Sequence, residues 1–470
     1  MKLYPFQDQG IRQLNRFGGR GLLADQVGLG KSLQALAYAK RYVPESPAGP
    51  IVIVCPSHLK IHWERESKRV LPYEVEILNG QRVPEGYKPP GGNRVYVVNY
   101  DVLVPPNWGS RTPLPADSWT AWLLQQNPRI LIADEAHYCK SASTARTRAV
   151  KKLARQIPYM LALSGTPLTN KPTDLWPVLN LLRPDLWPSQ WDFNCSYTHA
   201  ISRWYGWEFK GAKNLDTLHD TLSRTVMVRR RKEDVLEDLP EITQTVIPVD
   251  VDLRDYRKAE ANFILWLRQE APTLAPSAAK ALELTRLNYL KEMAGKLKTP
   301  AVADLVRDHV ESNGKMLVGA VHHSVTKALL GGIGPKKCVL VNGEMTHKQK
   351  TAAFDKFNSD PKCEVLVGNL QSAGTGWSCT STSDCLLAEL PWVPVDVTQF
   401  IGRVHGIKRG LSGVGVNAKI MVARGTVDED LCEALQRKDG WAATAIDGDP
   451  EASAMNVHDQ CIAAMKRRHQ

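Results

Sequence analysis

The sequence has few features that would place it outside a cell interior. Its nine cysteines form no Cys-x-x-Cys pair and have no closely spaced histidines, which argues against both a zinc site and a disulfide framework. No run of eighteen apolar residues occurs, and the start, MKLYPFQDQG, lacks the apolar stretch of a signal peptide. We therefore expect reduced thiols, no structural metal, no membrane partner and an intracellular location, in the cytoplasm of a prokaryotic or virus-infected cell or in a nucleus.

Length and charge bear on the number of domains and on the kind of partner. The 470 residues are 43% hydrophobic, which is enough for two or three packed domains. Lys and Arg outnumber Asp and Glu by 60 to 49, for a formal charge of +11 and a pI near 9.1. A polyanionic partner suits this balance, but a merely solvated basic surface explains it equally well.

Short apolar runs alternate with helical patterns in two parts of the chain. Nearly continuous Val, Ile and Leu runs such as IVIVC, RILIAD and KMLVGAV indicate strands buried on both faces, as in parallel sheets covered by helices. Between them, leucines at helical spacing indicate a helical insertion. The sequence therefore predicts an α/β fold with two lobes of parallel sheet flanked by helices. We expect a first lobe over 1–170, an insertion with a basic linker block over 171–299, and a second lobe over 300–470.

A glycine-rich turn in the first lobe has the form of a phosphate-binding loop. In LLADQVGLGKS an apolar strand leads through Gly28 and Gly30 into a helical pattern, so backbone N–H groups and a helix N-terminus would meet phosphate oxygens. Lys31 would neutralise the β- and γ-phosphates, and the Ser32 hydroxyl would ligate Mg²⁺. The strict pattern has glycine where this chain has Asp25. The strand and helix on either side disfavour a plain turn, so we expect ATP and Mg²⁺ as cofactors.

Two further strand ends carry polar residues. RILIADEAH places Asp134 and Glu135 after a buried strand, where a parallel sheet exposes ligand-binding groups. Asp134 would hold Mg²⁺ and Glu135 would orient and deprotonate the attacking water. Ser164 and Thr166 of SGTPLTN follow the next strand and would sense the γ-phosphate beside it. Taken alone, each motif also fits a solvated strand end or a tight turn.

In this order the motifs resemble those of superfamily 2 helicases of the Swi/Snf family. LYPFQDQG, GLGKS, CPSHLKIHWERE, ADEAH and SGTPLTNKPTDLW are similar to the Q-motif and motifs I, Ia, II and III. VMVRRRKEDVLEDLP, GKMLVGAVHHSV, SAGTGWSCTSTSDCLLAELPW and QFIGRVHGIKRG continue the match, so it covers about 3 to 437. WYGWEFKGAKNL and LLAELPW look most like the annealing-helicase, fork-remodelling branch. The resemblance implies two tandem RecA-like lobes and DNA-dependent ATP hydrolysis.

The resemblance also implies roles for single residues. Gln7 would read the adenine, and Gly376 and Gln399 would contribute to the nucleotide site from the second lobe. Thr375 would contact DNA. Arg403 would approach the γ-phosphate as a catalytic arginine, a contribution worth about 10³–10⁵ in rate in well-studied phosphoryl transfers.

Motif VI departs from the family pattern at one position. Its usual second arginine is Gly406 here, so the motif lacks one positive charge. Either Arg403 suffices, or Lys408 or Arg409 replaces the missing group, or ATP is hydrolysed slowly. We expect activity to be retained.

Basic and aromatic residues near the motifs are candidates for DNA binding. Contacts to the DNA backbone would give binding that does not read sequence and that weakens steeply with salt. The alternative is that the basic block pairs with neighbouring acidic residues and that the tryptophans pack the insertion. The candidates are Lys60, Trp63, Lys140, Lys171, Arg229, Arg230, Trp204 and Trp207.

The sequence thus predicts an ATP-dependent translocase on double-stranded or branched DNA. It would act as a monomer and remodel or anneal branched DNA by fork regression, branch migration or strand annealing, hydrolysing ATP to ADP and phosphate. Two alternatives remain open at this stage. One is a motor subunit of a larger restriction or transcription-recycling complex, and the other is a weakly catalytic DNA-binding module.

Overall fold

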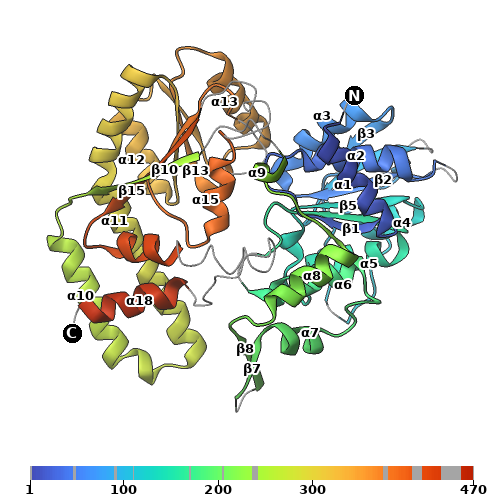
Figure 1. The fold of residues 1–470 in the computed structure, drawn as a ribbon, viewed down its shortest axis with the longest axis horizontal. Coiled ribbons are helices and arrows are strands. Elements are labelled where there is room, and N and C mark those ends of the chain that lie inside the picture. The colour runs from blue at the N-terminus through green and yellow to red at the C-terminus, as the bar shows by residue number, and fades with distance from the viewer. Residues whose placement is uncertain are drawn as a thin grey trace. The chain divides into compact units, whose positions relative to one another are not determined.

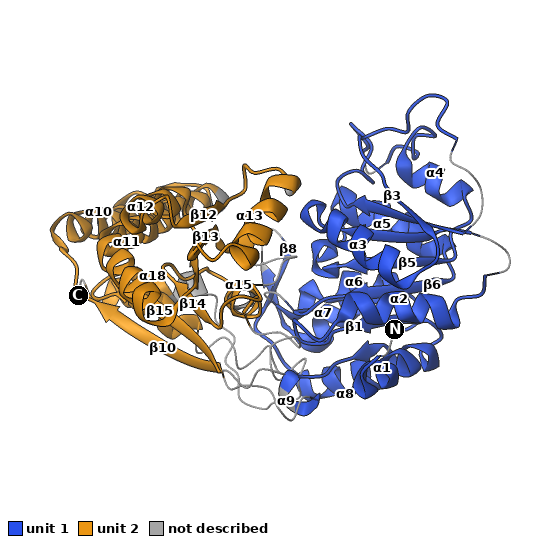
Figure 2. Cartoon of the chain, turned by 90° about the horizontal axis from the view of Figure 1, so that it is seen from above, with its two compact units in different colours: residues 1–237, 441–451 blue, residues 238–440, 452–470 orange. Residues whose placement is uncertain are grey.

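The chain divides into two compact units (Figure 2). Unit 1 comprises residues 1–237 with 441–451, and unit 2 comprises 238–440 with 452–470. The structure is a computed structural model, and it describes residues 3–45, 49–88, 93–109, 111–168, 171–203, 206–235, 242–373, 379–404, 415–435 and 457–468.

Unit 1 is built on a sheet whose seven described strands all run parallel (Figure 1). In spatial order they are β3 (Glu74–Ile77), β4 (Arg94–Asn99), β2 (Ile51–Cys55), β5 (Ile130–Asp134), β6 (Tyr159–Leu163), β1 (Arg20–Leu23) and β9 (Met227–Val228). The last strand, β9, lies about 200 residues after β1 in the sequence and pairs with it. Residues that follow β9 therefore run beside the segment that follows β1.

The continuous apolar sequence of the central strands reflects burial on both faces. In β2, Ile51 and Ile53 pack into one hydrophobic cluster, whereas Val52 and Val54 pack into another. Successive side chains of a strand point to opposite faces, so each face needs its own cover of helices. Helices α1, α2 and α3 supply residues to the first cluster, and α4, α5, α6 and α8 supply residues to the second.

The helices of unit 1 have the following bounds. They are α1 (Pro5–Arg16), α2 (Lys31–Tyr42), α3 (Lys60–Val70), α4 (Trp119–Gln125), α5 (Ala145–Gln156), α6 (Trp176–Leu182), α7 (Gln190–Tyr197), α8 (Leu215–Thr225) and α9 (Lys232–Val235). Short 3₁₀ turns lie at η1 (Ser57–Leu59), η2 (Ala136–Cys139) and η3 (Pro172–Asp174). An antiparallel hairpin of β7 (His199–Arg203) and β8 (Gly206–Lys210) extends away from the large sheet beside α7 (Figure 1).

Unit 2 contains a second parallel sheet, with six strands among the described residues. In spatial order they are β10 (Ile242–Val249), β15 (Val416–Ala423), β14 (Asp384–Leu387), β11 (Met316–Ala320), β13 (Val365–Asn369) and β12 (Cys338–Val341). Its helices are α10 (Arg254–Gln269), α11 (Pro276–Asn313), α12 (His323–Ile333), α13 (His347–Ser359), α14 (Leu370–Ala373), α15 (Pro394–Ile401) and α18 (Val457–Arg468), with the 3₁₀ turn η4 (Ala271–Thr273). Leu317 packs on one face of β11, and Met316 and Val318 pack on the other.

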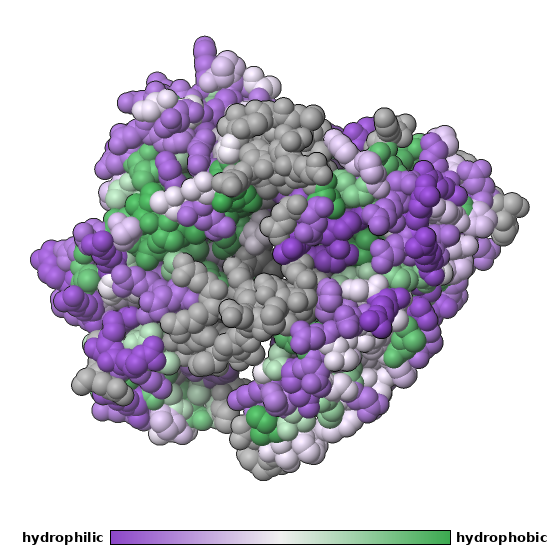
Figure 3. Space-filling view, in the orientation of Figure 1, coloured by the Kyte–Doolittle hydropathy of each residue, from purple (hydrophilic) through white to green (hydrophobic). Residues whose placement is uncertain are grey.

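The expected α/β architecture of two parallel sheets flanked by helices is confirmed. The segment predicted to form an insertion is divided between the units, since 171–237 belongs to unit 1 and 238–299 to unit 2. Besides helices it supplies the hairpin and the strands β9 and β10. Within the described ranges no helix is long and apolar enough to cross a membrane. The face drawn in Figure 3 is mostly hydrophilic, with smaller hydrophobic areas.

Candidate functional site

The loop between β1 and α2 has the backbone of a phosphate-binding turn. Gly28 and Gly30 have φ angles of 94° and 75°, in the left-handed region that favours glycine. Gly30 is the N-cap of α2, so the N-terminus of this helix lies at the loop. A Cβ at Gly30 would lie 2.7 Å from Nε2 of Gln7, a group that donates to the Leu29 carbonyl at 3.0 Å. Gln7 on α1 is therefore packed directly against the loop.

Lys31 lies among acidic side chains at the start of α2. Its Nζ donates to the Asp25 carbonyl at 2.8 Å. Burial lowers the pKa of Lys31, and nearby carboxylates, with Glu135 the strongest, oppose this effect. A Cβ at Gly165 would lie 3.2 Å from the Lys31 Nζ, which places the turn after β6 beside the ammonium group. The Lys31 ammonium thus lies between the backbone of the glycine loop and the turn after β6.

Asp134 ends β5 with its carboxylate held in place. One oxygen accepts a hydrogen bond from Nε1 of Trp63 at 2.7 Å, and the other accepts from the Glu135 N–H at 3.0 Å. The hydroxyl of Tyr100 donates to the Asp134 carbonyl at 2.8 Å. Burial and the neighbouring Glu135 carboxylate raise the pKa of Asp134 to about 7. A divalent cation at this carboxylate would favour its deprotonated form.

Glu135 and the next strand end complete the cluster. Glu135 has a left-handed backbone, with φ of 50°, which is unusual for a non-glycine residue and marks local strain of the kind found at active sites. Nδ1 of His137 lies 3.2 Å from a Glu135 carboxylate oxygen and 3.4 Å from the Ser164 hydroxyl. The Ser164 hydroxyl in turn accepts from the Thr166 N–H at 3.2 Å. A hydrogen bond between His137 and Ser164 therefore links the two strand-end motifs, which the pairing of β5 with β6 brings side by side.

The residues present fit a nucleotide with a divalent cation. The hydroxyl oxygen of Thr166 is buried and has no hydrogen-bond partner among the described residues, which leaves a donor for a phosphate oxygen. Ser32 follows Lys31 in the first turn of α2. The part of the chain that the structure describes contains no group of three His, Cys, Asp or Glu residues that could hold a metal. Mg²⁺ in phosphate sites instead uses one or two protein oxygens together with phosphate and water.

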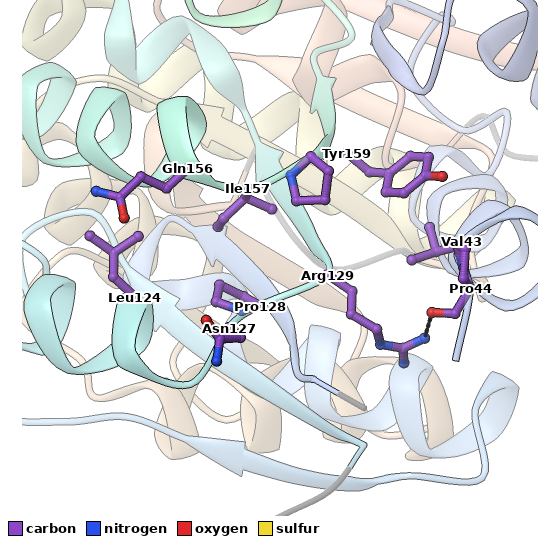
Figure 4. A pocket seen from close by; sticks show the side chains of 10 residues that line it. Val43, Pro44, Leu124, Asn127, Pro128, Arg129, Gln156, Ile157 and Tyr159 are labelled. Atoms are coloured by element: carbon purple, nitrogen blue, oxygen red, sulfur yellow. Dashed lines mark hydrogen bonds between the residues drawn. The ribbon is translucent and has the colours of Figure 1, made fainter. Parts of the chain in front are cut away.

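A pocket of about 300 Å³ lies at the opposite edge of the same sheet (Figure 4). Pro128 and Arg129 precede β5, and Ile157 and Pro158 precede β6, so the pocket is at the amino ends of these strands. The Arg129 guanidinium is occupied by the Pro44 carbonyl at 2.6 Å. Ligands of open parallel sheets bind outside the carboxyl ends of the strands, where Asp134 and Ser164 lie. The pocket is therefore separate from the cluster of motif residues.

Two family models match the chain. A SNF2-related domain matches residues 9–264, more than half of the sequence, and a helicase conserved C-terminal domain matches residues 298–408. The chain belongs to the SNF2-related family. This confirms the assignment that the motifs indicated.

Relatives of this SNF2-related chain include proteins whose names refer to DNA or chromatin. It is 30% identical to the DNA annealing helicase and endonuclease ZRANB3 of Mus musculus, over 96% of this chain and 41% of the relative. It is 29% identical to the SWI/SNF-related matrix-associated actin-dependent regulator of chromatin subfamily A-like protein 1 of Xenopus laevis, over 93% of this chain and 43% of the relative. The chain therefore spans less than half the length of these relatives. The Sulfolobus solfataricus SWI2/SNF2 ATPase core in complex with dsDNA is a similar solved structure, with 22% identity and a TM-score of 0.42, over 96% of this chain and 94% of that chain.

The predicted nucleotide residues of this SNF2-related chain fall on both units. Unit 1 brings together the phosphate loop, the end of β5 and the turn after β6. Arg403 and Gln399 belong to unit 2, where Gln399 is buried on α15 and the Arg403 carbonyl accepts from the Cys379 N–H at 2.9 Å. Thr375 and Gly376 lie outside the described residues, as do Gly406, Lys408 and Arg409 of motif VI.

Three of the DNA candidates have other roles in the structure. Trp63 is fully buried and bonded to Asp134, so it is not available to stack on DNA. Arg229 donates to the Ala24 carbonyl at 2.6 Å and to the Gly165 carbonyl at 3.2 Å. Arg230 pairs with Asp25. Both arginines therefore bond to the segments that follow β1 and β6. The predicted DNA contact is corrected for Trp63 and Arg230, whose side chains are enclosed, and it stays a prediction for Arg229.

The remaining candidates differ in accessibility. Lys60 is half-buried and donates to the Asn79 side chain at 2.6 Å. Lys140 and Lys171 are exposed beside the strand ends of the site. Trp207 is 55% exposed on the hairpin, and Trp204 lies outside the described residues.

Sequence reasoning did not find the residues that orient the site. Trp63, a predicted DNA contact, instead holds the Asp134 carboxylate, and nothing in the sequence points to Tyr100, which donates to the Asp134 carbonyl. These contacts join residues far apart in the chain, so no local spacing marks them. The one available signal was Asp25, because a carboxylate in place of a loop glycine requires a cation nearby.

Proposed function

We propose that this chain is the motor core of a DNA-dependent ATPase that translocates on double-stranded or branched DNA and remodels or anneals it. The observation that carries the proposal is the meeting of Lys31, Asp134 and Glu135 at the carboxyl edge of the first sheet, beside the glycine loop. The name of the mouse relative, a DNA annealing helicase, supports the choice of substrate.

The candidate nucleotide residues of unit 1 each have a definite role in the proposed reaction. Lys31 neutralises phosphate charge, and Ser32 and Asp134 supply protein oxygens for Mg²⁺. When bound, Mg²⁺ would neutralise charge on the β- and γ-phosphate oxygens. Glu135 orients the attacking water and accepts its proton, while His137 fixes the position of the Glu135 carboxylate.

Other tasks fall to groups that bind the ends of the nucleotide. Gln7 recognises the adenine, and the Thr166 hydroxyl donates to the γ-phosphate. By the family resemblance, Arg403 would stabilise negative charge that develops during transfer, and Gln399 would be a further nucleotide contact. Loss of such an arginine costs about 10³-fold or more in rate.

The hairpin of unit 1 is the proposed contact with unpaired bases. Trp207 on β8 and Trp191 on α7 are 55% and 45% exposed, and their rings lie perpendicular with centroids 5.2 Å apart. Phe209 packs against Trp191 from the hairpin side, at 5.4 Å. Rigid, exposed aromatic faces stack on bases of any sequence. We place the unpaired bases of a junction on this pair, and phosphates of the duplex near Lys140 and Lys171.

The test is ATPase activity of the full chain with single-stranded, duplex and forked DNA at matched nucleotide concentration. The proposal expects stimulation by duplex or forked DNA that exceeds stimulation by the single strand, and strand annealing or fork regression that requires ATP. Lys31→Ala and Glu135→Gln are expected to abolish turnover. Arg403→Ala and Arg409→Ala, compared side by side, identify the arginine that motif VI uses.

The outcomes separate the alternatives. Binding of forked DNA without any ATP turnover would refute the motor and leave a DNA-binding module. Turnover that appears only when a copurifying protein is present would identify a subunit of a larger complex. Unchanged rates in both arginine variants would exclude a catalytic role for either side chain.

A further inference from the structure

The phosphate loop begins with a fully buried carboxylate. Asp25 is 0% exposed, at the position where a simple phosphate loop has glycine. One of its oxygens accepts from Nε of Arg230 at 2.9 Å. The other accepts from Nη2 of Arg230 and from Nε2 of Gln34, the latter at 2.9 Å. The pair is bidentate, which is the geometry that a planar guanidinium forms best with a carboxylate.

Arg230 binds three different segments around this loop. Nη2 also donates to Oε1 of Gln34 on α2 at 2.7 Å, and Nη1 donates to the Phe6 carbonyl on α1. The guanidinium lies over the Phe6 ring, 5.3 Å from its centroid. The Arg230 carbonyl accepts from the Gln26 N–H at 3.0 Å, next to Asp25 in the loop. Arg230 is thus fixed by the loop and by both neighbouring helices.

The position of this pair matters because the loop must accept a polyanion. The Asp25 carbonyl already accepts from Nζ of Lys31, and the Asp25 carboxylate contributes to the electrostatic field at that ammonium. Without a cation of its own, the buried carboxylate would attract Lys31 and repel phosphate. Both effects act over a few ångströms in a site with little water, where charges interact strongly.

We propose that Arg230 is the counter-ion of an acidic phosphate loop: by neutralising Asp25 it leaves Lys31 for the nucleotide phosphates. Arg230 is a positioning residue that acts on nucleotide affinity and touches neither the nucleotide nor DNA. The inference rests on the proposed function only in taking a nucleoside triphosphate as the ligand.

The test measures binding of a fluorescent ATP analogue to the full chain without DNA, for four variants. Arg230→Gln leaves the Asp25 charge uncompensated, and we expect its Kd to rise about 10- to 100-fold, as for loss of charged hydrogen bonds. Asp25→Asn removes the negative charge and keeps Arg230, so affinity is expected to stay the same or to increase. Asp25→Asn combined with Arg230→Gln removes both charges, and its Kd is expected within about threefold of wild type.

The matched control is Arg231→Gln, which removes the same charge from the next residue. Arg231 pairs with Asp234 at 3.2 Å, and both side chains are 44% exposed. Its nucleotide affinity is expected to stay at the wild-type value. Thermal unfolding without nucleotide shows which variants fold. If Arg230→Gln does not fold, Arg230→Lys, which keeps the charge without the fork, is compared with Asp25→Asn instead.

The direction of the change in nucleotide Kd in each variant tests the proposal. Equal losses in Asp25→Asn and Arg230→Gln, with no recovery in the double variant, would overturn the proposal and leave an ion pair that only holds the fold. Wild-type affinity in Arg230→Gln would overturn it as well. Failure of the wild-type chain to bind the analogue would instead refute the proposed function, so the two failures are distinguishable.

Discussion

Replacing Trp63 by phenylalanine tests how the carboxylate of Asp134, the proposed Mg²⁺ ligand, is oriented. Trp63 is fully buried on α3, and its Nε1 donates to Asp134 over 2.7 Å, between residues 71 positions apart. Phenylalanine keeps the aromatic packing but has no donor, so one carboxylate oxygen of Asp134 loses its partner. Among the described residues, the Glu135 N–H then remains as the hydrogen-bond donor to this carboxylate.

The magnitude follows from the loss of one hydrogen bond to a charged group in a buried site. Such a bond contributes about 1.5–3 kcal/mol, and loss of a partner behind a metal ligand typically weakens metal binding by about 10- to 100-fold. The pKa of Asp134, already raised to about 7, rises further without this donor. Because Mg²⁺ binds the deprotonated form, the deficit of the variant should shrink as pH increases from 7 to 9.

The assay is the Mg²⁺ concentration that gives half-maximal nucleotide binding, measured at pH 7 and pH 9, together with nucleotide affinity in EDTA. We expect a higher Mg²⁺ requirement at pH 7, a smaller increase at pH 9 and unchanged affinity in EDTA. Trp176→Phe is the control, because Trp176 is also buried and its Nε1 has no hydrogen-bond partner among the described residues. An equal shift in both variants would refute the reasoning and reduce Trp63 to a packing residue.

Three further predictions concern stability and DNA binding. Lys298 and Asp428 form an almost completely buried ion pair, so Lys298→Met should lower the free energy of unfolding by about 3–5 kcal/mol in urea titrations, and a change below about 1 kcal/mol would contradict this. Burial lowers the pKa of Lys291 to about 8, below its ordinary 10.5. Between these two pH values the unfolded chain binds more protons than the folded chain, so the free energy of unfolding should rise from about pH 8 to 10.5. Lys291→Met should remove that rise, and an unchanged pH profile would show that this lysine is not its source. Trp207→Ala should weaken binding to forked DNA by about 10-fold through loss of stacking and leave duplex binding unchanged. Leu186→Ala is the control, because Leu186 is also exposed and apolar. Equal weakening on both DNAs would refute a role at unpaired bases.

Local sequence was sufficient for the fold class and for the backbone of the glycine loop. Runs such as IVIVC identify strands buried on both faces, and β2 indeed contributes alternate residues to two clusters. Gly28 and Gly30 indicate a turn that only glycine adopts readily, and the structure gives both a positive φ. These features depend on residues within one strand, loop and helix, so a short stretch of sequence contains them completely.

The sequence is a poorer guide to which basic and aromatic side chains are exposed, because charge and aromaticity do not reveal which way a side chain points. Trp63 and Arg230 have the residue types of a DNA-binding surface, yet one is fully buried and the other is enclosed by the phosphate loop and two helices. Trp207 has the same chemistry as Trp63 and is exposed. The difference lies in the helix or hairpin that carries each residue and in the surface against which it packs.

The sequence by itself determined that this chain is an SNF2-related protein with a phosphate loop, a DEAH strand end and two parallel sheets. Only the tertiary structure decided which cation pairs with the Asp25 carboxylate of the loop and which side chain holds the Asp134 carboxylate. Arg230 meets Asp25 across 205 residues because β9 pairs with β1, and Trp63 meets Asp134 because α3 packs on the sheet. Such contacts arise from strand order and helix packing, which bring together residues that no spacing in the sequence connects.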